Sequence, residues 1–298
     1  MIETKIASVL ADQRILVTGV ARNCQKTLRK DVFRISGSLK GCKTLSWLVV
    51  ESDSNDKTVD ILSALEKEIP NFRFLSLGDL RQAVPLRTQR IAHCRNAYLE
   101  ELQSNPLYSN IDYVVVADLD GVNELISATG FASCWTRSDW DVSTANQRGP
   151  YYDISALVHP IWSPNYCWDQ FNFLFTHNIS KKRAIEAAVY SRMVTISEAE
   201  NWIEVDSAFG GLAIYRRQAL AGVQYDGLDG AGNEICEHLS LHRGIKANGY
   251  RVFINPRLVN AGLNAHSYQS TMVPRIVKSV ARFFRPLAKL LPGARNSS

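Results

Sequence analysis

The sequence lacks the cysteine patterns that bind zinc or build a disulfide framework. Its six cysteines lie at wide, irregular intervals, with no C-x-x-C pair and no paired histidines close by. Such a distribution is typical of proteins in a reducing compartment.

Long apolar runs are also missing. No stretch reaches the roughly 18 to 20 apolar residues of a membrane span, and the first fourteen residues mix acids and bases without the apolar segment of a secretory signal. We therefore expect a cytoplasmic protein, or one bound peripherally at the inner face of the cytoplasmic membrane.

Glycine and proline are scarce, at 17 and 10 of 298 residues, which excludes collagen-like and low-complexity chains. Apolar residues make up 46% of the chain, enough for one sizeable core. The net charge is +5, but residues 272–298 hold six Lys and Arg and no acid, so the body of the chain is close to neutral. A near-neutral body argues against an extended nucleic-acid surface, and we expect no nucleic-acid partner.

Acidic residues are absent from the C-terminal tail, residues 272–298. Its apolar residues, among them Ile276, Val280, Phe283 and Leu287, recur at helical spacing between the cations. This pattern predicts a basic amphipathic helix on an anionic membrane surface, or a helix docked on the body. We therefore divide the chain into one folded domain, 1–271, and this tail.

Short apolar runs alternate with amphipathic stretches along the first 120 residues. We expect strands at 14–20, 44–50, 72–77 and 112–117, with helices at 25–39, 57–69 and 88–103 between them. This order predicts an α/β fold: a mostly parallel, Rossmann-like central sheet with helices on both faces. In such sheets ligands bind beyond the carboxyl ends of the strands.

Two carboxylates follow the fourth strand, at Asp118 and Asp120. Alternate residues of an extended chain share a face, so both can reach one hard cation such as Mg²⁺ or Mn²⁺. Glu51 and Asp53 follow the second strand at the same edge, where an acid can bind a nucleotide's base or ribose. The alternative for Asp53 is that it caps the next helix, as we expect of Asp56.

Residues 49–62 resemble the second-strand signature of GT-A fold glycosyltransferases, residues 116–121 resemble their D-x-D metal motif, and residues 209–217 resemble their glycine loop. Residues 234–244 and 249–256 are similar to the family's acidic helix and closing strand. The amino-acid sequences of residues 151–160 and 236–242 also resemble those of capsule and polysaccharide-type transferases, such as fungal capsule-associated α-mannosyltransferases. The resemblance implies a GT-A fold and a hexosyltransferase that uses a nucleotide-sugar donor with Mn²⁺ or Mg²⁺.

That resemblance assigns further residues. A divalent ion would stabilise the departing diphosphate, with Asp120 as its direct ligand, Asp118 at the ribose or an ion-bound water, and His266 completing the site. Gly210 and Gly211 would permit close approach of a sugar. On the helix before the D-x-D strand, Arg90 and Arg95 are candidates for bidentate contact with the diphosphate, or form a solvated helix face.

A glutamate in the predicted helix 234–246 is the candidate for general acid/base catalysis. Glu237 or Glu234 would take the acceptor's proton if transfer inverts the anomeric centre, or would orient a sugar if it retains configuration. The family's usual Glu-Asp pair reads Glu237-His238 here, which leaves the choice between the two acids open.

Aromatic residues gather between 140 and 168, where they either stack on an acceptor sugar or pack in the core. We expect the acceptor to be a glycan or lipid-linked glycan of surface polysaccharide synthesis, and GDP-mannose is our first choice of donor. Two alternatives remain, a sugar-nucleotide nucleotidyltransferase and a non-catalytic glycan-binding protein. The loop after the first strand is poor in glycine, which disfavours the former.

Overall fold

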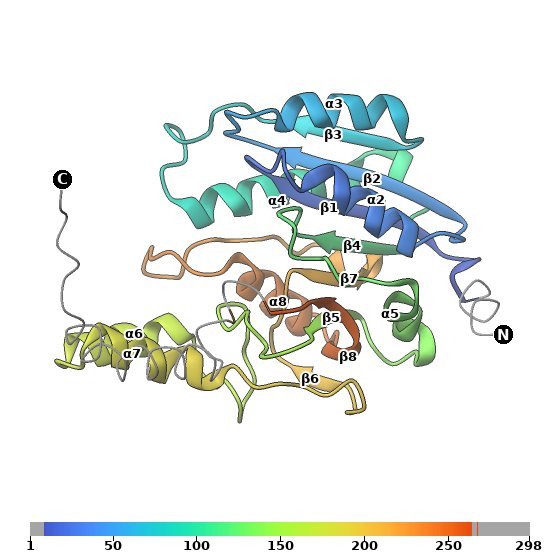
Figure 1. The fold of residues 1–298 in the computed structure, drawn as a ribbon. Helices are drawn as coiled ribbons and strands as arrows, with labels where there is room; N and C mark the ends of the chain where they lie inside the picture. The colour runs from blue at the N-terminus through green and yellow to red at the C-terminus, as the bar shows by residue number, and fades with distance from the viewer. Residues whose placement is uncertain (1–8, 264–266, 268–298) are drawn as a thin grey trace, which may run out of the picture.

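A computed structural model describes residues 9–263 and 267 of the chain. His266 and the tail 272–298 lie outside the described residues, so the predictions for them stay predictions. One eight-stranded sheet runs through the molecule in the order β3-β2-β1-β4-β7-β5-β8-β6 (Figure 1). Its strands are β1 (Arg14–Ala21), β2 (Thr44–Glu51), β3 (Phe72–Ser76), β4 (Tyr113–Ala117), β5 (Val142–Gln147), β6 (Ile203–Val205), β7 (Leu212–Arg216) and β8 (Val252–Ala261).

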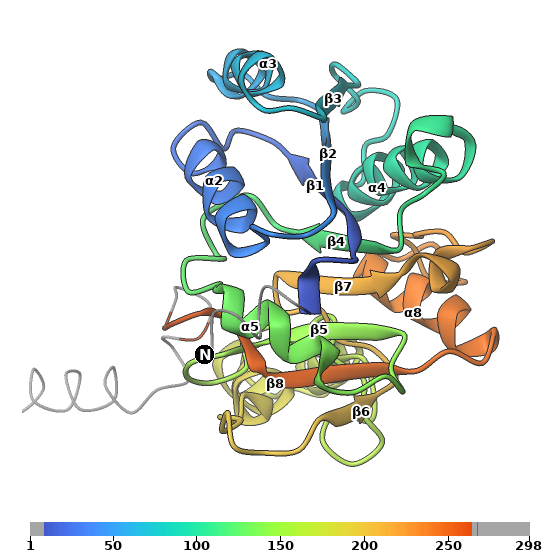
Figure 2. The same cartoon turned by 90° about the vertical axis from the view of Figure 1, so that its right-hand side faces the viewer.

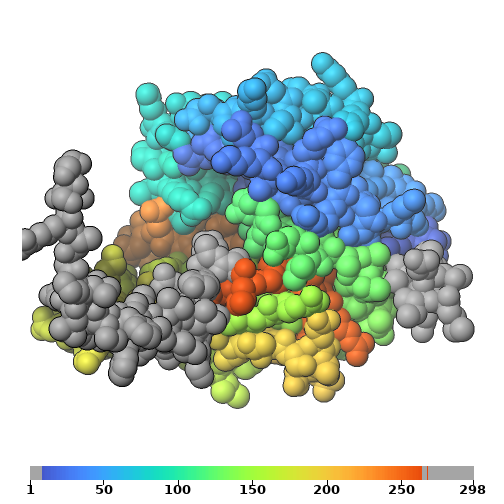
Figure 3. Space-filling view, viewed as in Figure 1, coloured from blue at the N-terminus to red at the C-terminus, as the bar shows by residue number. Residues whose placement is uncertain are grey.

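The first half of the sheet is parallel, as the alternating pattern predicts. β1 pairs in parallel with both β2 and β4, and β2 pairs in parallel with β3. β7 then runs antiparallel between β4 and β5, β8 is parallel to β5, and β6 is antiparallel to β8. The mostly parallel α/β sheet is therefore confirmed. The N-terminal segments, blue to cyan in the space-filling view, lie above the C-terminal segments, yellow to red (Figure 3).

Helices cover both faces of the sheet (Figure 2). One face packs against α2 (Leu28–Ser38), α3 (Thr58–Glu68) and α5 (Ala128–Ser133), and the other packs against α4 (Arg87–Ser104) and α8 (Glu237–Ala247). A hairpin of α6 (Cys167–Thr176) and α7 (Lys181–Ala188) projects to one side of the molecule, at the lower left in Figure 1. Short 3₁₀ turns are η1 (Pro106–Tyr108), η2 (Cys134–Thr136), η3 (Tyr190–Arg192) and η4 (Arg217–Leu220).

The sheet separates two hydrophobic clusters, one on each of its faces, and its buried strands contribute side chains to both. β4 is buried at every position, and its valines alternate between the two hydrophobic clusters, Val114 and Val116 on one face and Val115 on the other. A strand that is apolar at consecutive positions is typical of a sheet covered on both faces.

Predicted helix starts needed correction. α2 begins at Leu28 instead of residue 25, because the N–H groups of Thr27 and Leu28 both bond to the carbonyl of Cys24 in a turn that precedes the helix. The helix predicted from 234 begins only at Glu237. The N-cap predicted at Asp56 is also displaced: α3 begins at Thr58 with Lys57 at its N-cap position, and Asp56, one residue earlier, accepts a 2.9 Å hydrogen bond from the Thr58 N–H.

All six cysteines are free. Among residues 9–263 and 267, no helix combines the length and the apolar character that crossing a membrane requires.

Candidate functional site

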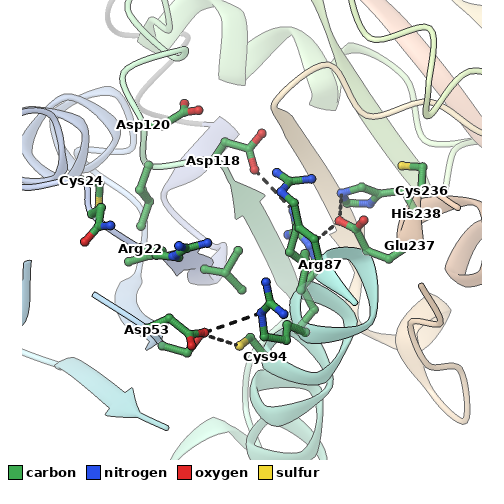
Figure 4. Close-up of a pocket in the computed structure, with 18 of the residues that line it drawn as sticks. Arg22, Cys24, Asp53, Arg87, Cys94, Asp118, Asp120, Cys236, Glu237 and His238 are labelled. Carbon is green, nitrogen blue, oxygen red and sulfur yellow. Dashed lines mark hydrogen bonds and ion pairs between the residues drawn. The ribbon is translucent and has the colours of Figure 1, made fainter. Parts of the chain in front are cut away.

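A pocket of about 440 Å³ opens at the carboxyl ends of β1, β2 and β4, where the parallel sheet predicts a ligand. Helix α4 and the start of α8 form its far wall (Figure 4). Its charged lining consists of four arginines and five acids: Arg22, Arg87, Arg90, Arg95, Asp53, Asp118, Asp120, Asp153 and Glu237.

Asp118 and Asp120 both line this pocket, as the motif predicts. The N–H of Asp118 donates to the carbonyl of Gly211 at 2.9 Å, and Asn123 donates to the carbonyl of Asp118 at 2.7 Å. These contacts fix the backbone of the motif just beyond β4. The carboxylate of Asp120 accepts only a 3.3 Å bond from the Val122 N–H among the described residues, which leaves it available to a ligand.

Arg95 lies between two of the acids instead of facing open solvent. Its Nε donates to Glu237 at 2.9 Å, and its second terminal nitrogen lies 3.4 Å from Asp118. The side chain is 4% exposed, with its guanidinium 5.4 Å from the ring of Phe209 and 5.6 Å from that of Tyr225. Arg95 thereby links the D-x-D motif on β4 to the first residue of α8.

Burial raises the pKa of Asp118 to about 7. Arg95 acts in the opposite direction, while the carboxylates of Asp120, Asp153 and Glu237 raise the pKa further. Several acids thus converge on Asp118, and a bound cation would offset their mutual repulsion.

Glu237 and Glu234 lie in different surroundings. Glu237 lines the pocket at the N-terminus of α8, with a side chain that is 9% exposed. Glu234 precedes the helix and accepts hydrogen bonds from the backbone and hydroxyl of Thr88, at 2.9 and 3.0 Å. It therefore caps the start of α4 and is not part of the pocket lining.

The two acids after β2 hold loops together. Glu51 is 2% exposed and accepts bonds from the Ser54 N–H and the Ser76 hydroxyl, at 2.9 and 2.6 Å. It is not in the lining of the main pocket but lines, with Asp53, a separate hollow of about 300 Å³, so the structure does not place it against a nucleotide in the main pocket.

Asp53 does reach the pocket wall. Its φ of 58° is in the left-handed region, and its carboxylate accepts the N–H groups of Leu80 and Arg81 at 3.1 Å each. Burial favours a higher pKa, but hydrogen bonds from Ser52 and from these N–H groups outweigh it and lower the pKa of Asp53. Asp53 therefore does not cap the next helix, whose N-cap is Lys57.

Arg90 is held at the edge of the pocket. It donates to the carbonyls of Val84 and Pro85, and its Nε lies 3.8 Å from Asp53. Two further pocket arginines, Arg22 and Arg87, have no ion-pair partner among the residues that the structure describes. They are the cations most available to an anionic ligand.

Gly210 and Gly211 form a tight turn beside the pocket, with φ of 72° and 86°. A Cβ on Gly211 would lie 2.7 Å from the Tyr152 hydroxyl. The Gly210 N–H donates to Asp153 at 3.0 Å. The turn places Asp153 and orients β7, and neither glycine belongs to the pocket lining.

The aromatic segment mostly builds the core. Trp140 and Tyr151 are 1% and 0% exposed, and Trp162 and Trp168 pack partly buried against the core. Asp153 is the residue of this segment that lines the pocket.

A divalent ion would find few protein ligands in this pocket. Within residues 9–263 and 267, no three or more His, Cys, Asp or Glu side chains cluster as a ready-made metal site. Asp118 and Asp120 offer hard oxygen donors, the type that Mg²⁺ and Mn²⁺ prefer, and a diphosphate would have to supply further oxygens. His266 lies outside the described residues.

The chain is similar in fold to known structures. A mannosyltransferase from Pyrobaculum calidifontis, in complex with GDP-Man and Mn²⁺, superposes with a TM-score of 0.50 and 16% identity over 93% of this chain. This chain spans 66% of that protein's length. The fold is that of a GT-A glycosyltransferase.

Two other glycosyltransferases are less similar in structure. TarS from S. aureus, in complex with UDP-GlcNAc, has a TM-score of 0.49 and 14% identity over 91% of this chain and 65% of its own. Glucosyl-3-phosphoglycerate synthase from Mycobacterium tuberculosis, with Mn²⁺, UDP and its product, has a TM-score of 0.45 and 16% identity over 93% of this chain and 82% of its own. No protein-family model and no curated protein sequence matches the chain.

Sequence reasoning missed four pocket residues of interest: Arg22, Arg87, Asp153 and His238. Arg22 follows β1 at the same carboxyl edge as the D-x-D motif, so the strand order was a signal for it. Asp153 and His238 reach the pocket through loop and helix packing, which local spacing does not reveal.

Proposed function

We propose that the protein is a metal-dependent glycosyltransferase that moves a sugar from a nucleotide-sugar donor to a glycan or lipid-linked glycan. The observation that carries this proposal is the pairing, in one pocket, of the Asp118 and Asp120 carboxylates with the cations Arg22 and Arg87. Carboxylates suit a divalent ion, and arginines suit a diphosphate. The GT-A fold supports the same function.

Asp120 would hold the ion directly, because its carboxylate has few competing contacts. Asp118, already near Arg95, would contact the ribose or an ion-bound water. When bound, the ion supplies charge stabilisation for the departing diphosphate. Arg22, Arg87 and Arg90 would bind its remaining oxygens.

Glu237 is the acid that we assign to the reacting sugars, since Glu234 is used to cap α4. Arg95 and the N-terminus of α8 hold Glu237 in one orientation. If transfer inverts the anomeric centre, Glu237 would accept the acceptor's proton, and if transfer retains configuration it would orient a sugar hydroxyl.

GDP-mannose is the proposed donor, in part because the mannosyltransferase with which the chain superposes binds it. Synthesis of a surface polysaccharide is the proposed setting. The tail 272–298 would attach the protein to the inner face of the cytoplasmic membrane by its six cations.

A thermal-shift screen tests the donor. GDP-mannose, UDP-sugars, CMP-sugars and dTDP-sugars are each added with and without Mn²⁺, and we expect stabilisation by GDP-mannose only when the metal is present. The Asp120→Ala variant should lose this stabilisation and at least about a hundredfold in turnover, while keeping the melting temperature of the free protein. Turnover that keeps its level and its Mn²⁺ requirement in this variant would contradict the metal assignment.

Turnover itself distinguishes an enzyme from a binding protein. Mn²⁺-dependent donor hydrolysis or transfer by the wild type is expected, whereas binding without any hydrolysis would indicate a non-catalytic glycan-binding protein. The Glu237→Gln variant should lower kcat much more than donor affinity. An effect confined to acceptor KM would give Glu237 a binding role only.

A further inference from the structure

The hairpin of α6 and α7 exposes large apolar side chains at its tip. Phe173 is 61% exposed, Phe175 is 52% exposed and Ile179, in the connection between the helices, is 37% exposed. Within the hairpin Phe175 stacks on Phe171 and Phe173 packs on His177, with ring centroids 5.9 and 4.2 Å apart, yet more than half of Phe173 and of Phe175 stays exposed. Ala184 and Ala188 of α7 are buried.

The base of the hairpin is firmly attached to the body. Arg192, 8% exposed, donates to the hydroxyl of Ser163 and the carbonyl of Asn165 at 2.8 Å each, and it also contacts the side chain of Gln170 at the start of α6. Trp168 donates to the Ser155 hydroxyl at 3.0 Å. The apolar tip is therefore presented on a well-anchored support.

Positive charge accompanies the apolar tip. Residues 170–185 contain no acid, while Lys181, Lys182 and Arg183 follow one another at the start of α7 and are all exposed. The hairpin also lies on the side of the molecule toward which the arrowheads of β2 and β4 point, the side on which the pocket opens (Figure 1).

We propose that this tip, formed by Phe173, Phe175, Ile179 and the cations at 181–183, docks on an anionic lipid surface. The aromatic and aliphatic side chains would enter the boundary between headgroups and acyl chains, and the cations would lie among the lipid phosphates. Charge complementarity favours this occupant over two others. The tail 272–298 and a second copy of the hairpin are both positively charged and would repel the tip.

The orientation of the molecule follows from this contact. With the hairpin on the membrane, the edge of the sheet that carries the pocket lies close to the lipid surface, where a lipid-linked acceptor would present its sugar. This consequence rests on the proposed function. The docking itself does not, because it requires neither donor nor acceptor.

Co-sedimentation of the full chain with lipid vesicles tests the docking. Vesicles of phosphatidylcholine with about 30% phosphatidylglycerol are compared with pure phosphatidylcholine, without any nucleotide sugar. The F173S/F175S and K181A/K182A/R183A variants should each weaken partition onto the anionic vesicles by about tenfold or more. Full binding of both variants would overturn the proposal, because the tail alone would then explain attachment.

Matched controls separate docking from general effects. Leu107→Ser removes an apolar side chain that is 68% exposed on η1, and K30A/K40A/K57A removes the same number of exposed cations elsewhere. Both controls should bind as the wild type does, and equal losses in the controls would overturn the proposal. The proposal would also be overturned if light scattering shows a wild-type dimer and an F173S/F175S monomer, because the tip would then be a protein interface.

Discussion

Replacing Arg95 by methionine should destabilise the folded protein, because it leaves a nearly buried carboxylate without its partner. Arg95 is 4% exposed, and the side chain of Glu237, to which it donates at 2.9 Å, is 9% exposed. Removing one partner of a buried pair costs about 3 to 5 kcal/mol. The contact of Arg95 with Asp118 is longer, at 3.4 Å, and Asp118 is 34% exposed, so this figure counts only the Glu237 carboxylate.

Methionine recovers part of the packing against Phe209 and Tyr225 but not the cation–π contact, which contributes about 1 kcal/mol. We therefore expect the free energy of unfolding to fall by about 4 kcal/mol, which a domain with roughly 5 to 15 kcal/mol of total stability can tolerate. Urea unfolding followed by circular dichroism measures this change.

A double-mutant cycle tests the cause. In R95M/E237Q the unpaired carboxylate is gone, so the double variant should be more stable, by about 2 kcal/mol, than the sum of the two single effects predicts. Arg90→Met is the matched control, since Arg90 donates to the carbonyls of Val84 and Pro85 and has no contact with Glu237. Its effect should add to that of E237Q. An R95M variant within about 1 kcal/mol of wild type, or an additive R95M cycle, would refute the reasoning.

Three further predictions concern other parts of the chain. Gly211→Ala should lower the free energy of unfolding by about 2 to 4 kcal/mol, because the φ of Gly211 is 86° and the new Cβ would lie 2.7 Å from the Tyr152 hydroxyl and 2.9 Å from Val122. Urea unfolding measures this change, and a fall below about 0.5 kcal/mol would contradict the strain that we assign to this turn. Burial lowers the pKa of His242 to about 3, so between pH 6.5 and 3 the unfolded chain binds a proton there that the folded chain does not. As the pH decreases through this range, the free energy of unfolding should decrease by up to about 1.4 kcal/mol per pH unit because of this residue. A His242→Gln variant should show a correspondingly shallower loss in unfolding between pH 6.5 and 5, whereas an unchanged slope would assign the acid sensitivity to other groups. Truncation after residue 271 should weaken binding to anionic vesicles in a salt-dependent way and spare turnover of a soluble acceptor, and loss of folding on truncation would make the tail part of the core.

Strand pattern alone predicted the parallel half of the sheet. The runs at 14–20, 44–50 and 112–117 are largely apolar, a pattern typical of burial from both faces, whereas 72–77 alternates with Arg73 and Ser76 and forms the partly buried edge strand β3. Each run became a strand within one or two residues of the predicted bounds. The rule that ligands bind at the carboxyl edge correctly placed Asp118, Asp120 and Asp53 at the pocket.

Helix starts and the roles of individual acids were less predictable. Glu234 and Glu237 are three residues apart and both precede or begin an apolar helical pattern, so local sequence does not separate them. They differ because Glu234 meets the first turn of α4, 146 residues away in sequence, whereas Glu237 meets Arg95. Likewise Glu51 and Asp53 are equivalent by position, yet only Asp53 reaches the pocket wall.

The sequence by itself determined the α/β class, the edge of the sheet at which the pocket opens and the pair of carboxylates that follow β4, because each depends on short-range periodicity and strand order. Only the tertiary structure decided that Arg95 is a buried link between Asp118 and Glu237, that Arg22 and Arg87 line the pocket without an ion pair to any described residue, and that the α6–α7 tip is left exposed. These features depend on contacts between residues far apart in the chain, and on which apolar side chains the packed core leaves uncovered, neither of which a local pattern records.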